Sequence, residues 1–306
     1  MSSRSLSTVS PIDLVVAHAR THAADHPEAE FQLFALVDAG QDKKTWQRFR
    51  NLGGQTLPIL KATGGAADQF SPHLVALESA VVASANLHAV LASRHPTTAY
   101  TLLCSELSLS ELHKHLSCFL EVKLPGNLEM LLAFWDPAIL GTLVGQTSDD
   151  SLHVPGPVLD SAQLLAFLSP MTAWWYCDRE SRWHQLVVPL AAHATSAAES
   201  FSLNQAQEDM LVEASVPDQV LYHLELNQPH LFEESQTHAA RYAFIKIVLS
   251  SARKLGLNGM RDLVNFAALC LIYRRRMQTD PKILSLLDNV QHKRITLDEA
   301  LPLMPE

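Results

Sequence analysis

The chain of 306 residues lacks the sequence motifs of the common enzyme classes. It contains no G-x-S-x-G nucleophile elbow, no glycine-rich phosphate loop that ends in Lys-Ser/Thr, no H-E-x-x-H zinc motif and no G-x-G-x-x-G dinucleotide fingerprint. Each of these motifs positions a nucleophile, a phosphate or a metal ion through its fixed spacing. Their absence gives no support for an enzyme, and we predict a protein without catalytic activity and without a cofactor.

Cysteine is scarce and widely spaced. The four cysteines are Cys104, Cys118, Cys177 and Cys270, and they form no C-x-x-C pair. Each lies among apolar neighbours, where a free thiol behaves as a small hydrophobic side chain. This pattern suits a reducing compartment.

Long apolar runs and a basic face are missing as well. No segment approaches the roughly 18 apolar residues of a membrane-spanning helix, and the N-terminus shows no signal peptide. The formal net charge is -9, whereas nucleic-acid-binding proteins usually carry a basic face. The one dense basic cluster, at residues 274–276, follows an apolar run and is typical of a helix C-terminus. We expect a cytoplasmic protein with no nucleic-acid partner and no membrane partner.

The residues that are present predict two parts. Hydrophobic residues make up 47% of the sequence, which is enough for a large core. Strand and helix patterns mix over residues 1–190 without a strict βαβ rhythm, so an α+β domain is expected there, a mixed sheet with flanking helices. A small-residue linker is predicted over residues 191–203. Helical patterns alone fill residues 204–306, which predicts an all-helical C-terminal lobe.

Three local predictions matter below. Residues 171–177 and 183–188 are expected to form a hairpin that turns at residues 178–181. Ser71 followed by Pro72 predicts the start of a helix, with the serine as its cap. In the C-terminal lobe, separate helices are expected over residues 205–213 and 218–226.

The stretch from residue 111 to residue 143 predicts a helix, a hairpin and a second helix. Pro125, Gly126 and Asn127 separate two apolar runs, and these residue types favour a tight turn. The second apolar run extends to Trp135 and ends at Asp136-Pro137. Aspartate accepts hydrogen bonds from the first free N–H groups of a helix, and proline is tolerated at its first position. A strand is therefore expected to deliver aromatic residues and a carboxylate to a helix start.

Few side chains suggest chemistry. Asp38 and Asp136 each follow a predicted strand and could form a paired carboxylate site, or they could cap a turn and a helix. Histidines occur in two close pairs, at positions 113 and 115 and at positions 18 and 22. The first pair points to different sides of a helix, and the second has no third ligand in view. We therefore predict no metal site.

Large apolar side chains offer candidates for binding a protein partner. Trp174 and Trp175 are neighbours on a predicted strand, so they face opposite ways, and one of them is expected to be exposed. A loop over residues 228–232 adds apolar side chains among polar neighbours. The partner-binding candidates are Trp174, Trp175, Trp183, Phe201, Leu231 and Phe232.

Five segments in order resemble a known family. They are FALVDAG at 34–40, SPHLVAL at 71–77, ELHKHLSCFL at 111–120, LLAFWDPAIL at 131–140 and FLSPMTAWWY at 167–176. This series is similar to the adaptor-chaperone family of bacterial type VI secretion, whose N-terminal domain was long catalogued as of unknown function. No single segment is specific, and the resemblance by motif covers about residues 30–180.

The resemblance assigns family positions residue by residue. Asp38 matches the family aspartate after the first strand, Pro72 and Leu74 match a "PYLV" segment, and Asp136 and Pro137 match a "DP" pair.

Two family arginines are replaced in this chain, by Ser117 and Ala133. An unpaired buried carboxylate costs several kcal/mol. We therefore predict that Asp38 and Asp136 are solvated or bound by backbone N–H groups. The alternative is that they meet other cations, such as Arg48 or Lys123.

The resemblance implies an adaptor that binds a toxic effector in the cytoplasm and loads it onto the VgrG spike. Two rival functions remain open. An immunity protein that neutralises a toxin would also be acidic and non-catalytic. A hydrolase would use Asp38 and Asp136, with their carboxyl groups about 5–10 Å apart in one open cleft.

Overall fold

The computed structural model describes residues 10–25, 32–60, 70–77, 85–91, 98–186, 188 and 201–305. The chain divides into two compact units, Met1–Leu211 and Val212–Glu306. The first combines a sheet with helices and the second is helical, so the predicted α+β class with a helical C-terminal region is confirmed. Most of the predicted linker, residues 191–200, lies outside the described residues.

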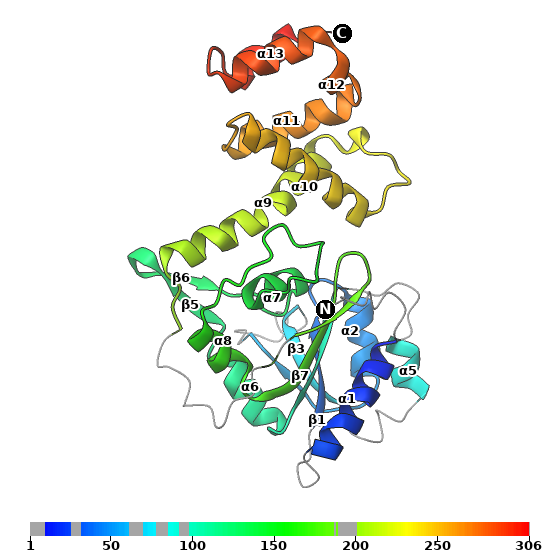
Figure 1. Ribbon diagram of the computed structural model, residues 1–306. Helices are drawn as coiled ribbons and strands as arrows, with labels where there is room; N and C mark the ends of the chain where they lie inside the picture. The colour runs from blue at the N-terminus through cyan, green and yellow to red at the C-terminus, as the bar shows by residue number, and fades with distance from the viewer. Residues whose placement is uncertain are drawn as a thin grey trace. The chain divides into compact units, whose positions relative to one another are not determined.

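A six-stranded sheet forms the centre of the first unit (Figure 1). Its strand order is β2-β3-β1-β4-β7-β8, and neighbouring strands pair antiparallel. The sheet is therefore antiparallel, where a mixed sheet was expected. The strands are β1 (Gln32–Asp38), β2 (Thr56–Pro58), β3 (Pro72–Leu77), β4 (Tyr100–Ser105), β7 (Met171–Cys177) and β8 (Trp183–Gln185).

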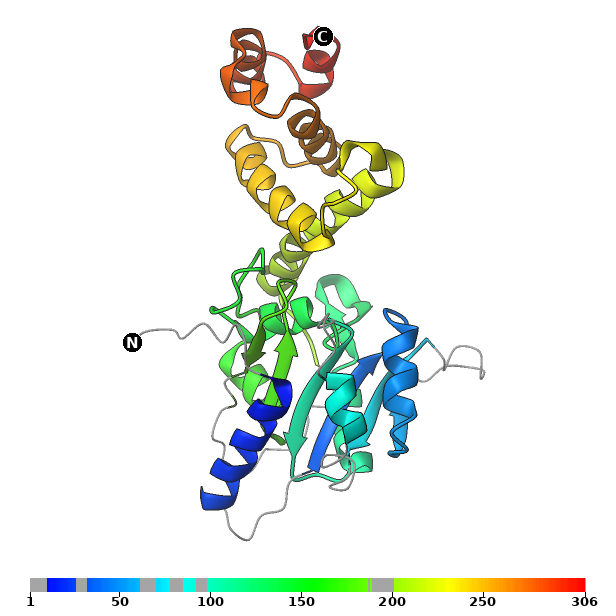
Figure 2. The same ribbon diagram turned by 90° about the vertical axis from the view of Figure 1, so that its right-hand side faces the viewer.

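Helices cover both faces of this sheet (Figures 1 and 2). One face packs on α1 (Pro11–Asp25), α2 (Lys43–Arg50) and α5 (Ala85–Leu91). The other packs on α6 (Leu109–Ser117), α7 (Pro137–Val144) and α8 (Ser161–Leu168). Neighbouring residues of a central strand are therefore both buried: Leu102 belongs to the first core and Leu103 to the second.

The predicted helix–hairpin–helix stretch is present, with a shorter second strand. Strands β5 (Glu121–Leu124) and β6 (Leu128–Leu131) pair around a turn at η1 (Pro125–Asn127), where Gly126 has a φ of 79°. The strand pairing stops at Leu131, and the chain turns before α7. The prediction that the strand extends to Trp135 was wrong, because the apolar residues after Leu131 are buried in a turn.

The segment that begins at Pro72 is a strand, and the predicted helix start was wrong. Strand β3 pairs with β1 on one side and with β2 on the other. Proline at the first position of a strand removes few of the hydrogen bonds between strands. Two flanking strands and a buried run of apolar residues therefore outweigh the capping signal of Ser71.

The helical elements after residue 203 begin with one long helix. The two helices predicted there form a single helix, α9 (Gln205–Asn227), which continues through Pro217. The other elements are η2 (Pro229–Leu231), α10 (His238–Lys254), α11 (Met260–Tyr273), α12 (Arg276–Thr279), α13 (Pro281–Gln291), α14 (Leu297–Ala300) and η3 (Leu301–Leu303). Among the described helices, none combines the length and apolar character that crossing a membrane requires.

Candidate functional site

The two motif carboxylates, Asp38 and Asp136, bind backbone N–H groups. Asp38 Oδ1 accepts hydrogen bonds from the N–H groups of Gly40 (2.9 Å) and Gln41 (3.0 Å), which closes the turn after β1. Asp136 Oδ1 accepts from the N–H groups of Ala138 (2.8 Å) and Ile139 (3.4 Å), so it caps α7. The prediction of backbone-bound carboxylates is confirmed, and within the described residues neither forms an ion pair with a cation.

The other motif positions serve the framework. Pro72 and Leu74 lie on β3 and are buried, with Leu74 fully inside the core that α6 and α7 cover. Pro137 occupies the first turn of α7, as the Asp-Pro pattern predicted. The residues that carry the family resemblance therefore build a strand, a turn and a helix start.

Both tryptophans of β7 are buried, so the prediction that one is exposed was wrong. Trp174 is 0% exposed, and its indole N–H donates to Thr101 Oγ1 at 2.9 Å. Trp175 is 1% exposed on the opposite face of the sheet. Strand alternation would expose one of them only if one face of the sheet met water, and helices cover both faces here.

The remaining partner-binding candidates divide into buried and accessible side chains. Trp183, Phe201 and Phe232 are each less than 9% exposed, which corrects the expectation that they offer a surface. Phe232 belongs to the core of the second unit, where the Arg241 guanidinium lies over its ring at 4.9 Å. Leu231 is half-buried and lines a groove described below.

The four histidines considered as metal ligands have other partners. In α6, His113 Nε2 lies 2.8 Å from the carbonyl oxygen of Pro58, and His115 Nε2 lies 3.0 Å from that of Phe167. In α1, His18 contacts Thr172 at 3.1 Å and His22 lies 3.6 Å from Glu106. Burial lowers the pKa of His115, which its hydrogen bond to Phe167 only partly offsets.

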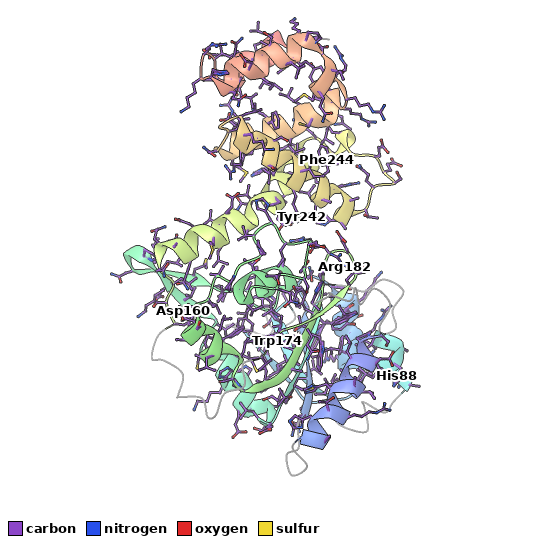
Figure 3. The ribbon with its side chains drawn as sticks, viewed as in Figure 1. His88, Asp160, Trp174, Arg182, Tyr242 and Phe244 are labelled. Carbon is purple, nitrogen blue, oxygen red and sulfur yellow. The ribbon has the colours of Figure 1, made fainter. Side chains whose placement is uncertain are left out.

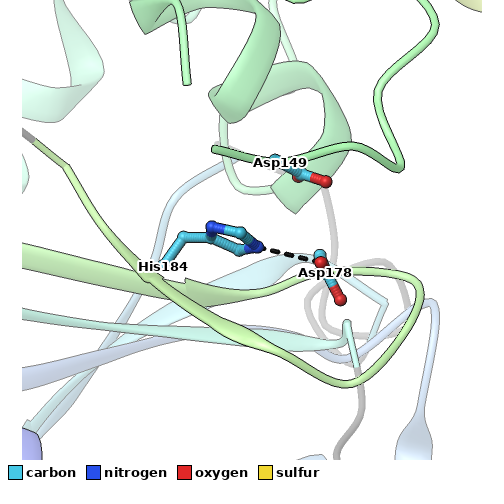
Figure 4. Close-up of side chains that lie close together, drawn as sticks. All are labelled: Asp149, Asp178 and His184. Atoms are coloured by element: carbon cyan, nitrogen blue, oxygen red, sulfur yellow. Dashed lines mark hydrogen bonds and ion pairs between the residues drawn. The ribbon is translucent and has the colours of Figure 1, made fainter. Parts of the chain in front are cut away.

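A cluster that the sequence analysis did not identify joins Asp149, Asp178 and His184 (Figure 4). Asp178 follows β7, His184 lies on β8, and Asp149 comes from the loop after α7. All three residues are buried, and their ligand atoms lie within 4.8 Å of one another. Tyr176 adds its hydroxyl, which donates to Asp149 Oδ2 at 2.8 Å. The cluster therefore links the β7–β8 hairpin to a distant loop.

Hydrogen bonds keep Asp178 ionised inside the protein. Burial by itself would raise the pKa of this carboxyl, but hydrogen bonds from His184 and Arg182 outweigh it and lower the pKa below its usual range. The Arg182 Nε and the His184 Nε2 each lie 2.8 Å from Asp178 Oδ2. For Tyr176, burial raises the pKa, and the neighbouring Asp149 adds to the effect. The hydroxyl therefore stays protonated and remains a donor.

A glycine of α7 makes room for this tyrosine. A Cβ atom at Gly141 would lie 2.5 Å from the Tyr176 hydroxyl oxygen. Such a contact is too short for ordinary packing, so a larger residue would force the hydroxyl away from Asp149.

The cluster fits a metal ion poorly, because its donor atoms are engaged. Asp178 Oδ1 accepts from the N–H groups of Glu180 and Arg182, both at 2.8 Å. Its Oδ2 accepts from Arg182 and His184, so all the lone-pair positions of the carboxylate are used. A cation would have to displace the Arg182 guanidinium and remove the proton from His184 Nε2. We conclude that the cluster has a structural role: Asp178 pairs with Arg182, and Asp149 joins the loop after α7 to the β7–β8 hairpin.

Part of the cluster could have been predicted from the sequence. The predicted hairpin places Tyr176 opposite His184, and its turn begins at Asp178. These positions put the aspartate near the histidine once the hairpin register is known. Asp149 carries no comparable signal, because it meets the hairpin only through the tertiary fold.

A small hollow beside the cluster is too small for a substrate. Its volume is about 30 Å³, which suits about one water molecule, whereas small-molecule sites usually span about 300–1,000 Å³. Asp136 lines this hollow with Asp149 and Asp178, whereas Asp38 does not. This hollow therefore joins Asp136 to the cluster and does not join it to Asp38.

The second unit contains a larger, mostly apolar groove of about 370 Å³. It lies among η2, α10, α11 and α12, and Phe244, labelled in Figure 3, lines it from α10. We call it the α10–α11 groove. Its lining residues are Leu231, Glu233, Gln236, Phe244, Ile247, Val248, Ser251, Cys270, Leu271, Arg274, Met277 and Gln278.

Comparison with known proteins gives one match. A family described as "Domain of unknown function (DUF4123)" matches residues 33–153, which is less than half of the chain. The match runs from β1 past α7 and includes Asp38, Pro72 and Asp136, but it stops before β7 and does not reach the second unit. No curated protein and no solved structure gives a significant match.

Proposed function

We propose that this protein is a non-catalytic adaptor that binds a type VI secretion effector and loads it onto the VgrG spike. The observation that carries the proposal is the family match over residues 33–153, because four of the five segments that resemble the effector adaptors lie within it. The fifth, at residues 167–176, follows it.

Two features of the described residues support a binding role over catalysis. In the first unit, the candidate carboxylates cap a turn and a helix, and the cluster around Asp178 is saturated by hydrogen bonds. In the second unit, the α10–α11 groove offers a concave apolar surface, which is the kind of surface that protein partners cover. Effector binding through stoichiometric contact needs such a surface and needs no reactive group.

Affinity capture distinguishes the adaptor from its rivals. The tagged full chain is co-expressed with the spike protein and the toxin encoded in the same genomic neighbourhood. An adaptor captures both the toxin and the spike. Capture of the toxin alone would favour an immunity protein, and capture of neither would overturn the adaptor proposal.

The hydrolase alternative has a separate test. Asp38→Asn and Asp136→Asn keep a side chain that can accept the same backbone hydrogen bonds, so each variant should fold and capture the same proteins as the wild type. If either substitution abolished toxin delivery while the protein stayed folded and captured its partners, a chemical role for the carboxylates would replace the adaptor proposal.

A further inference from the structure

We propose that the α10–α11 groove is the docking site for an amphipathic helix of a partner polypeptide, whose acidic first turn pairs with Arg274. This inference rests on the proposed adaptor function and adds where and what the protein binds. The groove lies outside the stretch that the family matches, in the second unit of the chain.

The apolar floor of the groove fits one face of a helix. Phe244, Ile247, Val248 and Ser251 lie at successive helical spacings on α10, and Leu271 faces the groove from α11. Ile247 is 71% exposed, an unusual state for a large aliphatic side chain that lines a concave surface. Helix-in-groove recognition places apolar side chains at such spacings against a surface of this kind.

One end of the groove is charged and holds a cation that a partner can use. Arg274 Nη2 lies 3.2 Å from Glu233 Oε1, with side chains that are 66% and 58% exposed. An exposed ion pair of this type contributes little to stability. A carboxylate of the partner can therefore replace Glu233 at low cost, and acidic side chains are favoured in the first turn of a helix.

The backbone conformation of Arg274 is a second indication that this end of the groove binds a partner. Its φ is 47°, in the left-handed region that favours glycine, although the residue is an arginine. Residues held in such conformations cluster at binding sites, where the surrounding structure maintains them. The conformation is observed at a residue that lines the groove, which points to a role for the side chain.

A buried acceptor at this end also has no partner. Gln236 lines the groove, and its Oε1 is buried without a hydrogen-bond partner among the described residues. Its backbone N–H donates to the Glu233 carbonyl oxygen at 3.0 Å, so it adjoins the residue that pairs with Arg274. The first turn of a helix carries free N–H donors, which this acceptor can meet after a small side-chain movement.

Peptide selection tests the proposal directly. A displayed library of random peptides of about 15 residues, enough for one average helix, is selected on the full chain. Recovered peptides are measured against Ile247→Glu and against Ile272→Glu. Ile272 is a matched control, because it is an exposed isoleucine of the same unit, 55% exposed, that does not line the groove.

The expected peptides carry apolar residues at helical spacing after an acidic start. Their affinity should fall about tenfold or more for Ile247→Glu and stay unchanged for Ile272→Glu. Changing the acidic residues of the peptide to lysine should weaken binding to the wild type about tenfold. The same change should have less effect on Arg274→Gly, which removes the cation and leaves a residue suited to the observed φ.

Folding is checked independently. Far-UV circular dichroism and thermal unfolding should be the same for both isoleucine variants. Ser251→Trp provides a second way to obstruct the groove, since Ser251 is an exposed lining residue, and it should weaken the same peptides.

Several results would overturn the inference. Peptides that bind Ile247→Glu and Ser251→Trp as tightly as the wild type would place docking elsewhere, and so would a selection without helical acidic sequences. Self-association of the wild type that Ile247→Glu abolishes would make a second copy of the chain the occupant. If toxin and spike are still captured in these cases, the adaptor proposal stands and only the groove assignment fails.

Discussion

The two units of this protein treat their polar and apolar groups differently. In the first unit, a sheet covered on both faces buries its tryptophans, and its acidic cluster is saturated with hydrogen bonds. In the second unit, the Ile247 side chain is exposed in a groove and Arg274 has a positive φ. The side-chain oxygen of Gln236 there accepts no hydrogen bond from the described residues. In the unit that carries the family resemblance, the motif carboxylates and Asp178 are engaged by hydrogen bonds. The groove that we propose for a partner lies in the other unit.

This difference changes how the motif residues are interpreted. Asp38 and Asp136 resemble catalytic candidates in the sequence, but each binds two backbone N–H groups next to its own position. Residues with such local roles preserve a framework. The motif residues of this protein therefore build its framework, and we expect binding specificity to come from surfaces outside them.

The largest expected effect tests how completely the first unit depends on its core. Trp174→Ala removes a fully buried indole and leaves Thr101 Oγ1 without its donor. We expect a loss of about 3–5 kcal/mol in the free energy of unfolding. All five tryptophans lie in the first unit, so tryptophan fluorescence during urea unfolding follows this unit. Leu128→Ala, at a side chain that is 63% exposed, is the control and should change little.

A slightly smaller effect is expected from breaking the acidic cluster. Asp178→Ala leaves Arg182 and His184 without their shared acceptor, and Arg182 is only 26% exposed. The expected loss is about 2–3 kcal/mol, less than for a fully buried pair, since Arg182 keeps Glu180 Oε2 at 3.1 Å as a partner. An unchanged urea midpoint would contradict the structural role of the cluster.

Acid unfolding gives the same cluster a second test. The pKa of Asp178 is lowered in the folded state, so its contribution is present at neutral pH and is lost as the pH falls below about 4. The wild type should therefore lose more stability in this acidic range than Asp178→Ala does.

The capping role of the motif aspartate predicts a moderate effect. Asp136→Ala removes the acceptor for the first N–H groups of α7, and the expected loss is about 1 kcal/mol. Asp136→Asn retains an oxygen acceptor and should lose much less. Urea unfolding followed by tryptophan fluorescence compares the two variants. Equal losses would mean that the charge of Asp136, more than its capping hydrogen bonds, stabilises the unit.

The smallest expected effect is a dependence on mildly acidic pH. Burial lowers the pKa of both His18 and His115 in the folded state. Their contribution is fully present above the unfolded value of about 6.5 and is lost as the pH falls through the lower folded values. The urea concentration at the unfolding midpoint of the first unit should therefore decrease when the pH is lowered from about 7 to about 5, a range set by that reference value.

Two substitutions separate this histidine effect from general acid sensitivity. His115→Gln should flatten the pH profile, because its side chain no longer titrates. His88→Gln, at the exposed residue labelled in Figure 3, should leave the profile unchanged. A wild-type midpoint that does not move over this range would contradict the prediction.

Short-range signals in the sequence determined much of the framework. Aspartate before proline predicted the start of α7, and Pro125-Gly126-Asn127 predicted the β5–β6 turn. Capping and turn formation depend on atoms only a few residues apart, so the sequence contains nearly all the information they need. The two replaced arginines likewise predicted that Asp38 and Asp136 would be solvated or bound by backbone N–H groups, and the structure shows the backbone bonds.

The tertiary structure alone decided the rest, because it depends on contacts between distant residues. Helices on both faces of the sheet bury both Trp174 and Trp175, which strand alternation by itself could not predict. Flanking strands turned Pro72–Leu77 into β3 against a helix signal. The meeting of Asp149 with the β7–β8 hairpin and the groove beside Ile247 both require segments that no local pattern brings together.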